Sequence, residues 1–509
     1  MSVFLGNPTM PPAAADISLL RGEEKFQKGA HAGLYNATQR RNLHKATTTI
    51  REKRAHVTSE IDDWELLRNA GSAIKRDVLA RLPELLEQFE AAVTARGGIV
   101  HWARDAKEAG EIVTKLVQDT GETEVVKIKS MATQEIALNE QLATVGIHAQ
   151  ETDLAELIVQ LGHDRPSHIL VPAIHRNRAE IRDIFVNEMP NTDDSLSSEP
   201  ADLAEASRQF LREQFMKAKV AICGANFGIA ETGHVTIVES EGNGRMCLTL
   251  PETLISVMGI EKLLPTFKDY EVFLQLLPRS STGERMNPYT SLWSGVTDDD
   301  GPKNFHIVLI DNGRTRALSN EIGREALKCI RCSACLNSCP VYERAGGHAY
   351  GSTYPGPIGA ILTPQLTGMI DAHDPNSSLP FASSLCGRCN EVCPVKIPIT
   401  DALVELRHQK VLTSKPVVEG SLMGIMQLTW GNKNIWNTLS RLVFLGRVMG
   451  GFNGKITHLP SALAGWTDVR DVAIPPKRTF RQWFESDEAQ QLLADARAAG
   501  IPAVDEEKE

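Results

Sequence analysis

The sequence predicts an α/β domain with a mostly parallel sheet, then a small cysteine-rich helical module, then a helical C-terminal segment. The parallel sheet is indicated by apolar runs that alternate with helix-like stretches. The small module is indicated by seven of the nine cysteines, which fall within residues 329–393. A chain of 509 residues is too long for one ordinary hydrophobic core, so several domains are expected.

The alternating pattern runs from about residue 65 to a turn signal at Asp311-Asn312-Gly313. The predicted helices span residues 74–95, 106–118 and 133–145, and the predicted strands span 98–102, 124–128, 146–149, 167–171, 218–223, 234–239, 245–250 and 305–310. The expected organisation is a helical N-terminal extension (1–64), the α/β domain (65–315), the cysteine module (316–408) and the C-terminal segment (409–509).

Composition excludes several classes of protein. A hydrophobic content of 42% and a charged content of 23% are typical of soluble globular proteins. The net charge of −10 argues against a nucleic-acid binder, and the basic run over 40–54 is expected to be a solvated helix face. No run of about 18 apolar residues is present, so no transmembrane segment is predicted. Clustered cysteines in a long chain favour a reducing compartment, so we expect a cytoplasmic protein that reaches a membrane only through partners.

The first cysteine run is Cys329-Ile-Arg-Cys332-Ser-Ala-Cys335-Leu-Asn-Ser-Cys339-Pro340. Its spacing, C-x2-C-x2-C-x3-C-P, is that of bacterial ferredoxins, in which three close thiolates hold one cluster and the fourth cysteine serves the other. Short spacers let the backbone curl around a cluster and point its N–H groups at the sulfurs. A zinc site usually takes two C-x2-C pairs, which this run does not match. The run therefore predicts iron–sulfur clusters.

The second run, Cys386-Gly-Arg-Cys389-Asn-Glu-Val-Cys393-Pro394, lacks one cysteine, and Ser383 stands at the missing position. With the usual crossing-over, the two runs supply two ligand sets. Cluster one is predicted to be held by Cys329, Cys332, Cys335 and Cys393, and cluster two by Cys339, Cys386 and Cys389.

The incomplete second set leaves three possibilities open. A [3Fe–4S] cluster needs only three thiolates, whereas a [4Fe–4S] cluster needs Ser383, another oxygen or nitrogen ligand, or an exogenous group. The third possibility is a labile cluster that is lost in air. A serine alkoxide is a hard ligand with a high proton affinity, so Ser383 is expected to be a loop or cap residue. We expect two [4Fe–4S] clusters, with [3Fe–4S] as the alternative at the second site.

The order of these motifs resembles the lactate-utilisation iron–sulfur proteins of the LutB (YkgF) type over nearly the full length. The resemblance is carried by Lys127-Ile-Lys-Ser-Met131, Glu151-Thr-Asp-Leu154, Pro172-Ala-Ile-His175, Ala230-Glu-Thr-Gly233, both cysteine runs, Gly347-His-Ala-Tyr-Gly351 and Pro475-Pro-Lys-Arg-Thr-Phe480. It implies an N-terminal LUD domain, similar to the CoA-transferase and ribose-phosphate-isomerase fold, followed by a dicluster ferredoxin module. It also implies an electron-transfer role in oxidising L-lactate to pyruvate. The implied partners are a cysteine-rich CCG-domain subunit and a smaller LUD-domain subunit.

The α/β domain contains weaker candidates for chemistry. Gly224-Ala-Asn-Phe-Gly228 follows a predicted strand and is either a ligand-binding strand end or a tight turn. Glu231 is a candidate acid, base or nucleophile, and Lys127 and Lys129 are candidates to meet an anionic substrate. The histidines and cysteines expected to be structural are His168, His175, His234, Cys223 and Cys247.

Three functions are compatible with these sequence features. The first is an electron-transfer subunit of a lactate-oxidising complex. The second is a LUD domain that is itself catalytic on lactate or a related anionic metabolite. The third is a relay subunit of another 2-hydroxy-acid oxidoreductase. No G-x-G-x-x-G fingerprint for flavin or nicotinamide follows a predicted strand, which favours a relay over a complete dehydrogenase.

Overall fold

Six parallel strands form the main sheet of the computed structural model, in the order β1-β10-β7-β4-β2-β3. The strands are β1 (Ile99–Ala103), β2 (Glu124–Lys127), β3 (His148–Glu151), β4 (Val220–Gly224), β7 (Thr253–Gly259) and β10 (Asn304–Ile310). A second sheet has the order β8-β5-β6-β9, from β5 (Phe227–Ile229), β6 (His234–Glu239), β8 (Leu263–Leu264) and β9 (Tyr289–Trp293). The structure describes residues 18–298, 300–368, 373–413, 417–442, 445–448, 450, 454–460, 464–467 and 470–499.

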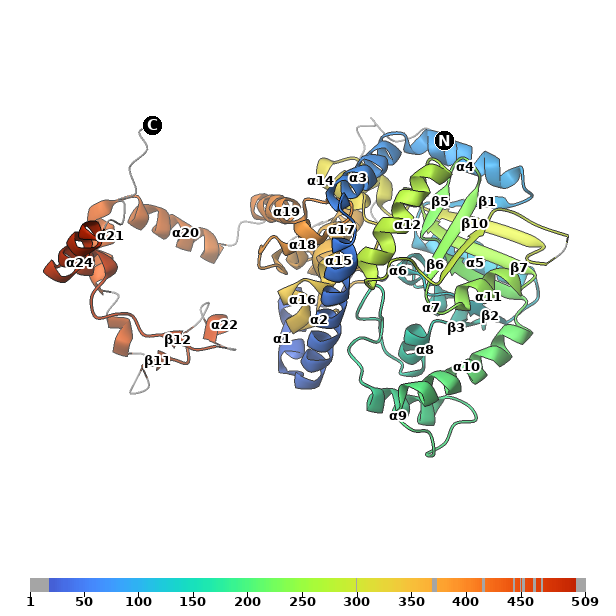
Figure 1. The fold of residues 1–509 in the computed structure, drawn as a ribbon, viewed down its shortest axis with the longest axis horizontal. Helices are drawn as coiled ribbons and strands as arrows, with labels where there is room; N and C mark the ends of the chain where they lie inside the picture. The colour runs from blue at the N-terminus through green and yellow to red at the C-terminus, as the bar shows by residue number, and fades with distance from the viewer. Residues whose placement is uncertain are drawn as a thin grey trace. The chain divides into compact units, whose positions relative to one another are not determined.

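Helices cover both faces of the main sheet (Figure 1). The helices of this region are α3 (Trp64–Ala80), α4 (Leu82–Thr94), α5 (Ala106–Gln118), α6 (Met131–Glu135), α7 (Leu138–Ala143), α8 (Leu154–Leu161), α9 (Arg178–Glu188), α10 (Pro200–Lys217), α11 (Asn243–Thr249), the 3-10 turn η1 (Ile260–Lys262) and α12 (Phe267–Ser281). One core packs α5 and α7 on one face of the sheet. The core on the other face includes α3, α4 and α12 and is continuous with that of the cysteine module.

The cysteine module is built of short helices. They are α13 (Arg314–Leu318), α14 (Glu321–Leu327), α15 (Ala334–Asn337), α16 (Pro340–Ala345), η2 (His348–Tyr350), α17 (Gly356–Thr367), η3 (Pro375–Phe381), α18 (Arg388–Val392) and α19 (Ile399–Thr413). The turn predicted at 311–313 separates β10 from α13, with Asn312 and Gly313 in the left-handed region at φ 40° and 89°. The α/β domain and the module therefore follow each other directly.

The N-terminal extension forms α1 (Phe26–Tyr35) and α2 (Ala37–Ser59), which lie beside α15 and α16 (Figure 1). Two arginines of α2 hold the cysteine module from this side. Arg51 Nη1 donates to the carbonyl of Asn337 at 2.9 Å, and Arg54 Nη2 donates to the carbonyl of Val392 at 2.9 Å. The expectation that the basic run is only a solvated face is therefore wrong for these two side chains.

Two predicted strands are wrong, and local polar contacts explain both. Residues 167–171 form a loop in which the N–H groups of Leu170 and Val171 donate to His168 Nδ1, each at 3.0 Å, instead of to a neighbouring strand. Residues 245–250 belong largely to α11, whose first N–H groups donate to the carboxylate of Glu239 at 2.8 and 2.9 Å. The predicted helix over 133–145 is divided into α6 and α7 at Ala137, which has φ 52°.

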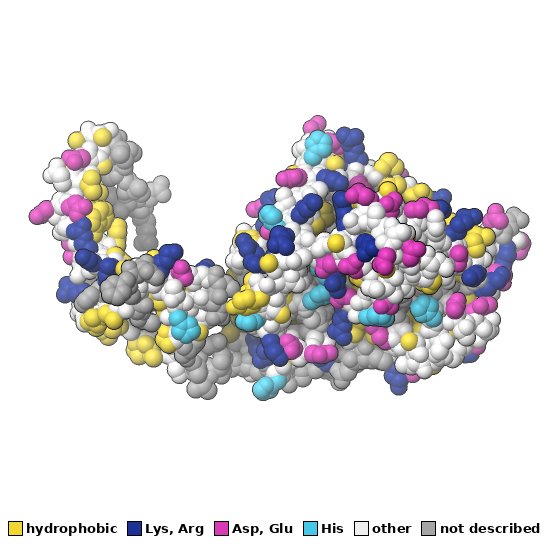
Figure 2. Space-filling model, turned by 90° about the horizontal axis from the view of Figure 1, so that it is seen from below, with side chains coloured by type: hydrophobic (Ala, Val, Ile, Leu, Met, Phe, Trp, Pro, Cys, Tyr) yellow, Lys and Arg dark blue, Asp and Glu magenta, His cyan; other side chains and the backbone are white. Residues whose placement is uncertain are grey.

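Residues from Lys415 onward form a separate compact unit. Its elements are α20 (Val417–Trp430), α21 (Lys433–Leu442), β11 (Lys455–Ile456), α22 (Ala464–Thr467), β12 (Val472–Ala473), α23 (Phe480–Phe484) and α24 (Asp487–Ala498). Large apolar side chains such as Met423, Leu428 and Trp430 are exposed on it, and Figure 2 shows hydrophobic groups on its surface. Within the described ranges, no helix has both the length and the apolar character needed to span a bilayer.

Candidate iron–sulfur site

The first cysteine run lies between α14 and α16 and includes α15, and the loop before α15 turns twice through the left-handed region. Arg331 has φ 60° and Ser333 has φ 62°, each next to a cysteine. Non-glycine residues adopt this conformation rarely, because Cβ crowds the following carbonyl at a cost of about 1–2 kcal/mol. The N–H of Arg331 donates to Cys329 Sγ at 3.3 Å, and the N–H of Tyr342 donates to Cys339 Sγ at 3.5 Å. The backbone thus wraps around the sulfurs, as the spacing predicts.

The second run repeats this backbone. Leu385 has φ 54° and Gly387 has φ 80°, at the positions that correspond to Arg331 and Ser333. The repetition extends to Ser383, whose Oγ accepts the N–H of Leu385 at 3.1 Å, as Cys329 Sγ accepts the N–H two residues further on. Ser383 therefore occupies the backbone position of a cluster ligand, with oxygen in place of sulfur.

The cysteines fall into two electrostatic groups. Burial, and then the negative charges of Cys329, Cys332 and Cys393, raise the pKa of Cys335 well above its usual value. This set joins three cysteines of the first run to the last cysteine of the second.

The remaining three cysteines interact in the same way. Burial, and then the charges of Cys339 and Cys386, raise the pKa of Cys389 to about 12. Cys389 also acts on Cys335, so the two groups are neighbours. The assignment of each set of cysteines to its own cluster stays a prediction.

The donor set fits iron–sulfur clusters. All seven cysteines of the two runs are free thiols, and thiolates are the ligands that such clusters take. Seven thiols exceed the four ligands of one tetrahedral zinc ion. Backbone N–H groups that donate to Cys329 Sγ and Cys339 Sγ are also suited to a cluster, because they stabilise its negative charge.

The two groups differ in exposure. Cys329, Cys332, Cys335 and Cys393 are only 6–9% exposed. Cys386 of the second group is exposed to solvent, beside exposed Leu385 and Phe381. Cys339 and Cys389 are each 7% exposed, so the first group is enclosed by protein and the second opens to the surface at Cys386.

A buried ion network fixes the first run to the α/β domain. The Arg314 guanidinium pairs with Glu135 at 2.9 Å and with Glu261, and Arg331 pairs with Glu261 at 3.3 Å. The Tyr354 hydroxyl donates to Glu135 at 2.6 Å. Burial raises the pKa of Glu261, but the charges of Arg314, Lys262 and Arg331 together outweigh burial and hold this pKa at about 2. The loop of the first run is thereby held against the carboxyl end of β7.

Of the weaker candidates of the α/β domain, Lys129 and the segment that starts at Gly224 come together, whereas Lys127 and Glu231 lie elsewhere. Lys127 Nζ donates to Glu151 at 2.6 Å in a buried pair, so its charge is neutralised. Glu231 is exposed and accepts the N–H of Phe267 at 3.2 Å, at the start of α12. Lys129 lines a cavity beside Gly224, at the carboxyl ends of β2 and β4. Cys223 and Cys247 are fully buried, as expected of core residues.

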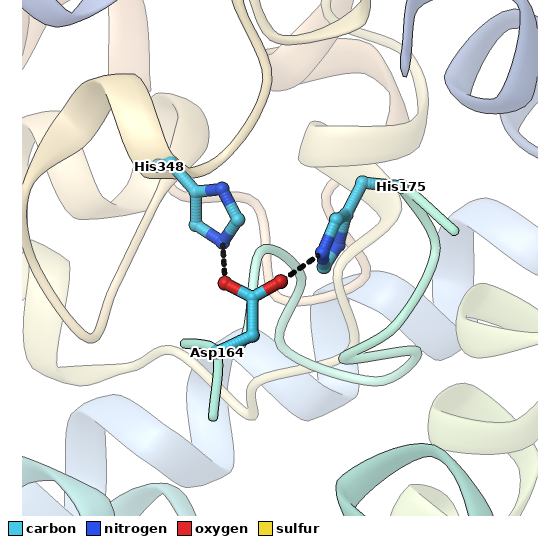
Figure 3. Close-up of side chains that lie close together, drawn as sticks. All are labelled: Asp164, His175 and His348. Carbon is cyan, nitrogen blue, oxygen red and sulfur yellow. Dashed lines mark hydrogen bonds and ion pairs between the residues drawn. The ribbon is translucent and has the colours of Figure 1, made fainter. Parts of the chain in front are cut away.

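Asp164, His175 and His348 form a compact group where the α/β domain meets the cysteine module (Figure 3). His175 Nε2 lies 2.8 Å and His348 Nε2 3.9 Å from the two carboxylate oxygens of Asp164. The Arg176 guanidinium also pairs with Asp164, and His348 Nε2 donates to the carbonyl of Arg165 at 2.7 Å. A metal ion would compete with that guanidinium and would need the lone pair where His348 carries its hydrogen. The group is a hydrogen-bonded contact between the loop that joins α8 to α9 and η2 of the cysteine module.

Comparisons with known proteins agree with this geometry. The LUD domain family matches residues 86–310, and the 4Fe-4S dicluster domain family matches residues 325–397. The fold and the cysteine site thus define an iron–sulfur protein in which a LUD domain is joined to a dicluster module. The chain is 40% identical to lactate utilization protein B of Oceanobacillus iheyensis and 39% identical to that of Bacillus subtilis, over 92% of this chain and 97% and 98% of theirs. The chain belongs to the lactate utilization protein B family.

Proposed function

We propose that this chain is the iron–sulfur electron-transfer subunit of a three-protein complex that oxidises L-lactate to pyruvate and so allows growth on lactate. The observation that carries the proposal is the pair of cysteine groups, one enclosed against the LUD domain and one that opens to solvent at Cys386. Lactate oxidation releases two electrons, and an iron–sulfur cluster carries one electron at a time. Two adjacent clusters suit a conduit from a two-electron site to an acceptor.

We assign a [4Fe–4S] cluster to each group. The first is held by Cys329, Cys332, Cys335 and Cys393, and the second by Cys339, Cys386 and Cys389 with Ser383 at the fourth position. The position of Ser383 Oγ supports an oxygen ligand there, in place of the loop role expected from its chemistry alone. N–H donation to the cysteine sulfurs, as from Ile397 to Cys393 Sγ at 3.3 Å, stabilises the negative charge that reduction adds.

The direction of transfer follows from the difference in exposure. Electrons enter at the enclosed group, which lies against the LUD domain, and leave at Cys386, where a second protein can approach. The proposed partners are a cysteine-rich CCG-domain subunit and a smaller LUD-domain subunit, assembled in the cytoplasm. A membrane-bound acceptor would be reached through these partners.

The proposal is tested by anaerobic reconstitution of this chain with the two partner subunits. Adding L-lactate is expected to bleach the visible absorbance of the clusters in the complex but not in the chain alone. A Cys339→Ala variant should still be reduced at the first cluster and should fail to pass electrons to an added acceptor. Bleaching of the isolated chain would overturn the relay role, and an unresponsive complete complex would overturn the assignment to lactate oxidation.

A further inference from the structure

A cavity of about 350 Å³ lies between the LUD sheet and the first cysteine run. It is lined by residues 128–130 after β2, by residues 224–226 at the end of β4, by Lys262 after β7, and by Ile330 and Arg331 of the cysteine loop. Pockets for small molecules commonly measure about 300–1,000 Å³. The cavity therefore has the size of a binding site, and one wall belongs to a cluster-binding loop.

The cavity stands where the strand order of the sheet reverses. Strand β2 pairs with β3 on one side and with β4 on the other, and β4 continues to β7 in the opposite direction. Parallel sheets bind ligands in the crevice that this reversal opens at the carboxyl ends of the strands. Gly224 permits the close approach there, because a Cβ atom would lie 2.3 Å from Ser130 Oγ.

The two lysines of the cavity have no direct partner. Neither Lys129 nor Lys262 makes a hydrogen bond or an ion pair with any residue that the structure describes. The acidic lining residues Asp153, Glu239 and Glu241 accept backbone N–H groups at the starts of α8 and α11, and the charges of Asp153 and Glu241 also act on Lys129 without a direct contact. Burial lowers the pKa of both lysines, a cost that a bound anion would relieve.

Further donors lie in the same cavity. Arg331 Nε is buried without a hydrogen-bond partner in the described structure. The Asn226 side-chain oxygen accepts the N–H of Val238 at 2.8 Å, and its amide nitrogen has no acceptor among the described residues. Two ammonium groups, a guanidinium N–H and an amide match an anion with more than one oxygen acceptor.

We propose that this cavity binds a small 2-hydroxy or 2-oxo monocarboxylate, with its carboxylate held by Lys129 and Lys262 next to the first cysteine run. The unpaired cations and the donors define an anion with several oxygen atoms. Among such anions, the choice of a 2-hydroxy or 2-oxo monocarboxylate rests on the proposed function. The LUD domain then contributes a binding site for the acid beside the enclosed cluster.

The test uses the purified full-length chain with its clusters, under anaerobic conditions. Pyruvate is titrated by calorimetry, and the midpoint potential of the first cluster is measured with and without it. Lys262→Gln and Lys129→Gln are each expected to weaken binding by roughly ten- to a hundredfold, the loss of one charge-assisted contact. Exposed Lys115→Gln is the matched control and should bind as the natural chain does. Because an anion disfavours an added electron, pyruvate should shift the midpoint potential to more negative values.

Acetate, which lacks the second oxygen function, should bind more weakly than pyruvate, and inorganic phosphate should not displace it. Pyruvate binding that is absent, or unchanged in both lysine variants at full iron content, would overturn the inference, as would tighter binding of phosphate. If the complete complex oxidises L-lactate while this cavity fails the test, the proposed function stands and only the site is wrong. If pyruvate binds here and the complex leaves lactate untouched, the electron-transfer role fails instead.

Discussion

In the first cysteine run the backbone enters the left-handed region at Arg331 and Ser333, and in the second run it does so at Leu385 and Gly387. The surroundings of the two loops differ. The cysteines of the first run are buried, whereas Leu385 is 38% exposed and Cys386 is also exposed. Local sequence thus sets the shape of both loops, and packing against the LUD domain distinguishes an enclosed loop from an exposed one.

The largest expected difference between the loops comes from removing one sulfur from each. Cys329→Ala should lose the first cluster and lower the free energy of unfolding by more than about 4 kcal/mol, because cluster binding is coupled to folding of the enclosed loop. Cys386→Ala should lose iron only from the second group, at a cost of about 1–2 kcal/mol, because solvent already reaches that loop. Cluster loss is measured by iron and sulfide content, and the free energy of unfolding by anaerobic urea unfolding. Equal destabilisation by the two variants would contradict the distinction between an enclosed loop and an exposed one.

Replacing a charged side chain near each loop should give the second largest difference in stability between the two loops. Arg314→Gln leaves two buried carboxylates, Glu135 and Glu261, without their cation and is expected to cost about 3–5 kcal/mol. The matched Arg388→Gln breaks an exposed pair with Glu391 in the second loop and should cost at most about 1 kcal/mol. Chemical denaturation of the two variants side by side gives the comparison. A similar midpoint for both would mean that the network does not support the first loop.

The enclosed loop should also respond to acid through His168. Its Nε2 donates to Asn337 Oδ1 at 3.0 Å, and burial lowers its pKa to about 3. In the unfolded chain this pKa is about 6.5, so the unfolded state binds a proton first and stability falls as the pH drops below 6.5. The loss should reach about 2 kcal/mol at pH 5. In His168→Gln, the fall in the free energy of unfolding between pH 6.5 and pH 5 should be smaller by this amount, as measured by urea unfolding. If this free energy depends on pH in the variant as it does in the natural chain, His168 is not the responsible group.

Much of the fold was predictable because its signals are local. The helix over 106–118 and the strand over 234–239 were predicted with the observed bounds, since an amphipathic period and an apolar run define them. The segments at 167–171 and 245–250 were wrongly predicted as strands, because backbone N–H groups in or next to them donate to polar side chains instead of to a neighbouring strand. Strand β7, at 253–259, was missed although it lies between β10 and β4 and is buried throughout.

The candidate site also has features that local sequence predicts and features that it does not. The wrapped shape of the two cysteine loops was predictable, because ligand spacing is a local property of two short runs, and the ligand sets themselves stay a prediction. The ion network was not, because Arg314 lies 179 residues from Glu135 and 53 from Glu261 in the sequence. Nothing in the basic run of α2 indicated that Arg51 and Arg54 reach carbonyl groups of the distant cysteine module. Such long-range contacts depend on the packing of segments that no local pattern relates.

The smallest expected effect on stability, and the sharpest test of the exposed loop, comes from Ser383. Ser383→Ala removes the proposed oxygen ligand and should convert the second cluster to a [3Fe–4S] form, visible by EPR after oxidation. Ser383→Cys should complete a four-thiolate set and make the cluster more resistant to air. Neither change should alter the free energy of unfolding by more than about 1 kcal/mol, because the loop is close to solvent.

Ser384→Ala is the matched control, since Ser384 is exposed and follows the ligand position by one residue. It should leave the EPR spectrum unchanged. If Ser383→Ala also leaves the spectrum unchanged, an exogenous group or another side chain completes the second cluster, and the serine only orders the loop by accepting the N–H of Leu385. The same backbone would then carry a ligand in the enclosed loop and a turn-forming residue in the exposed one.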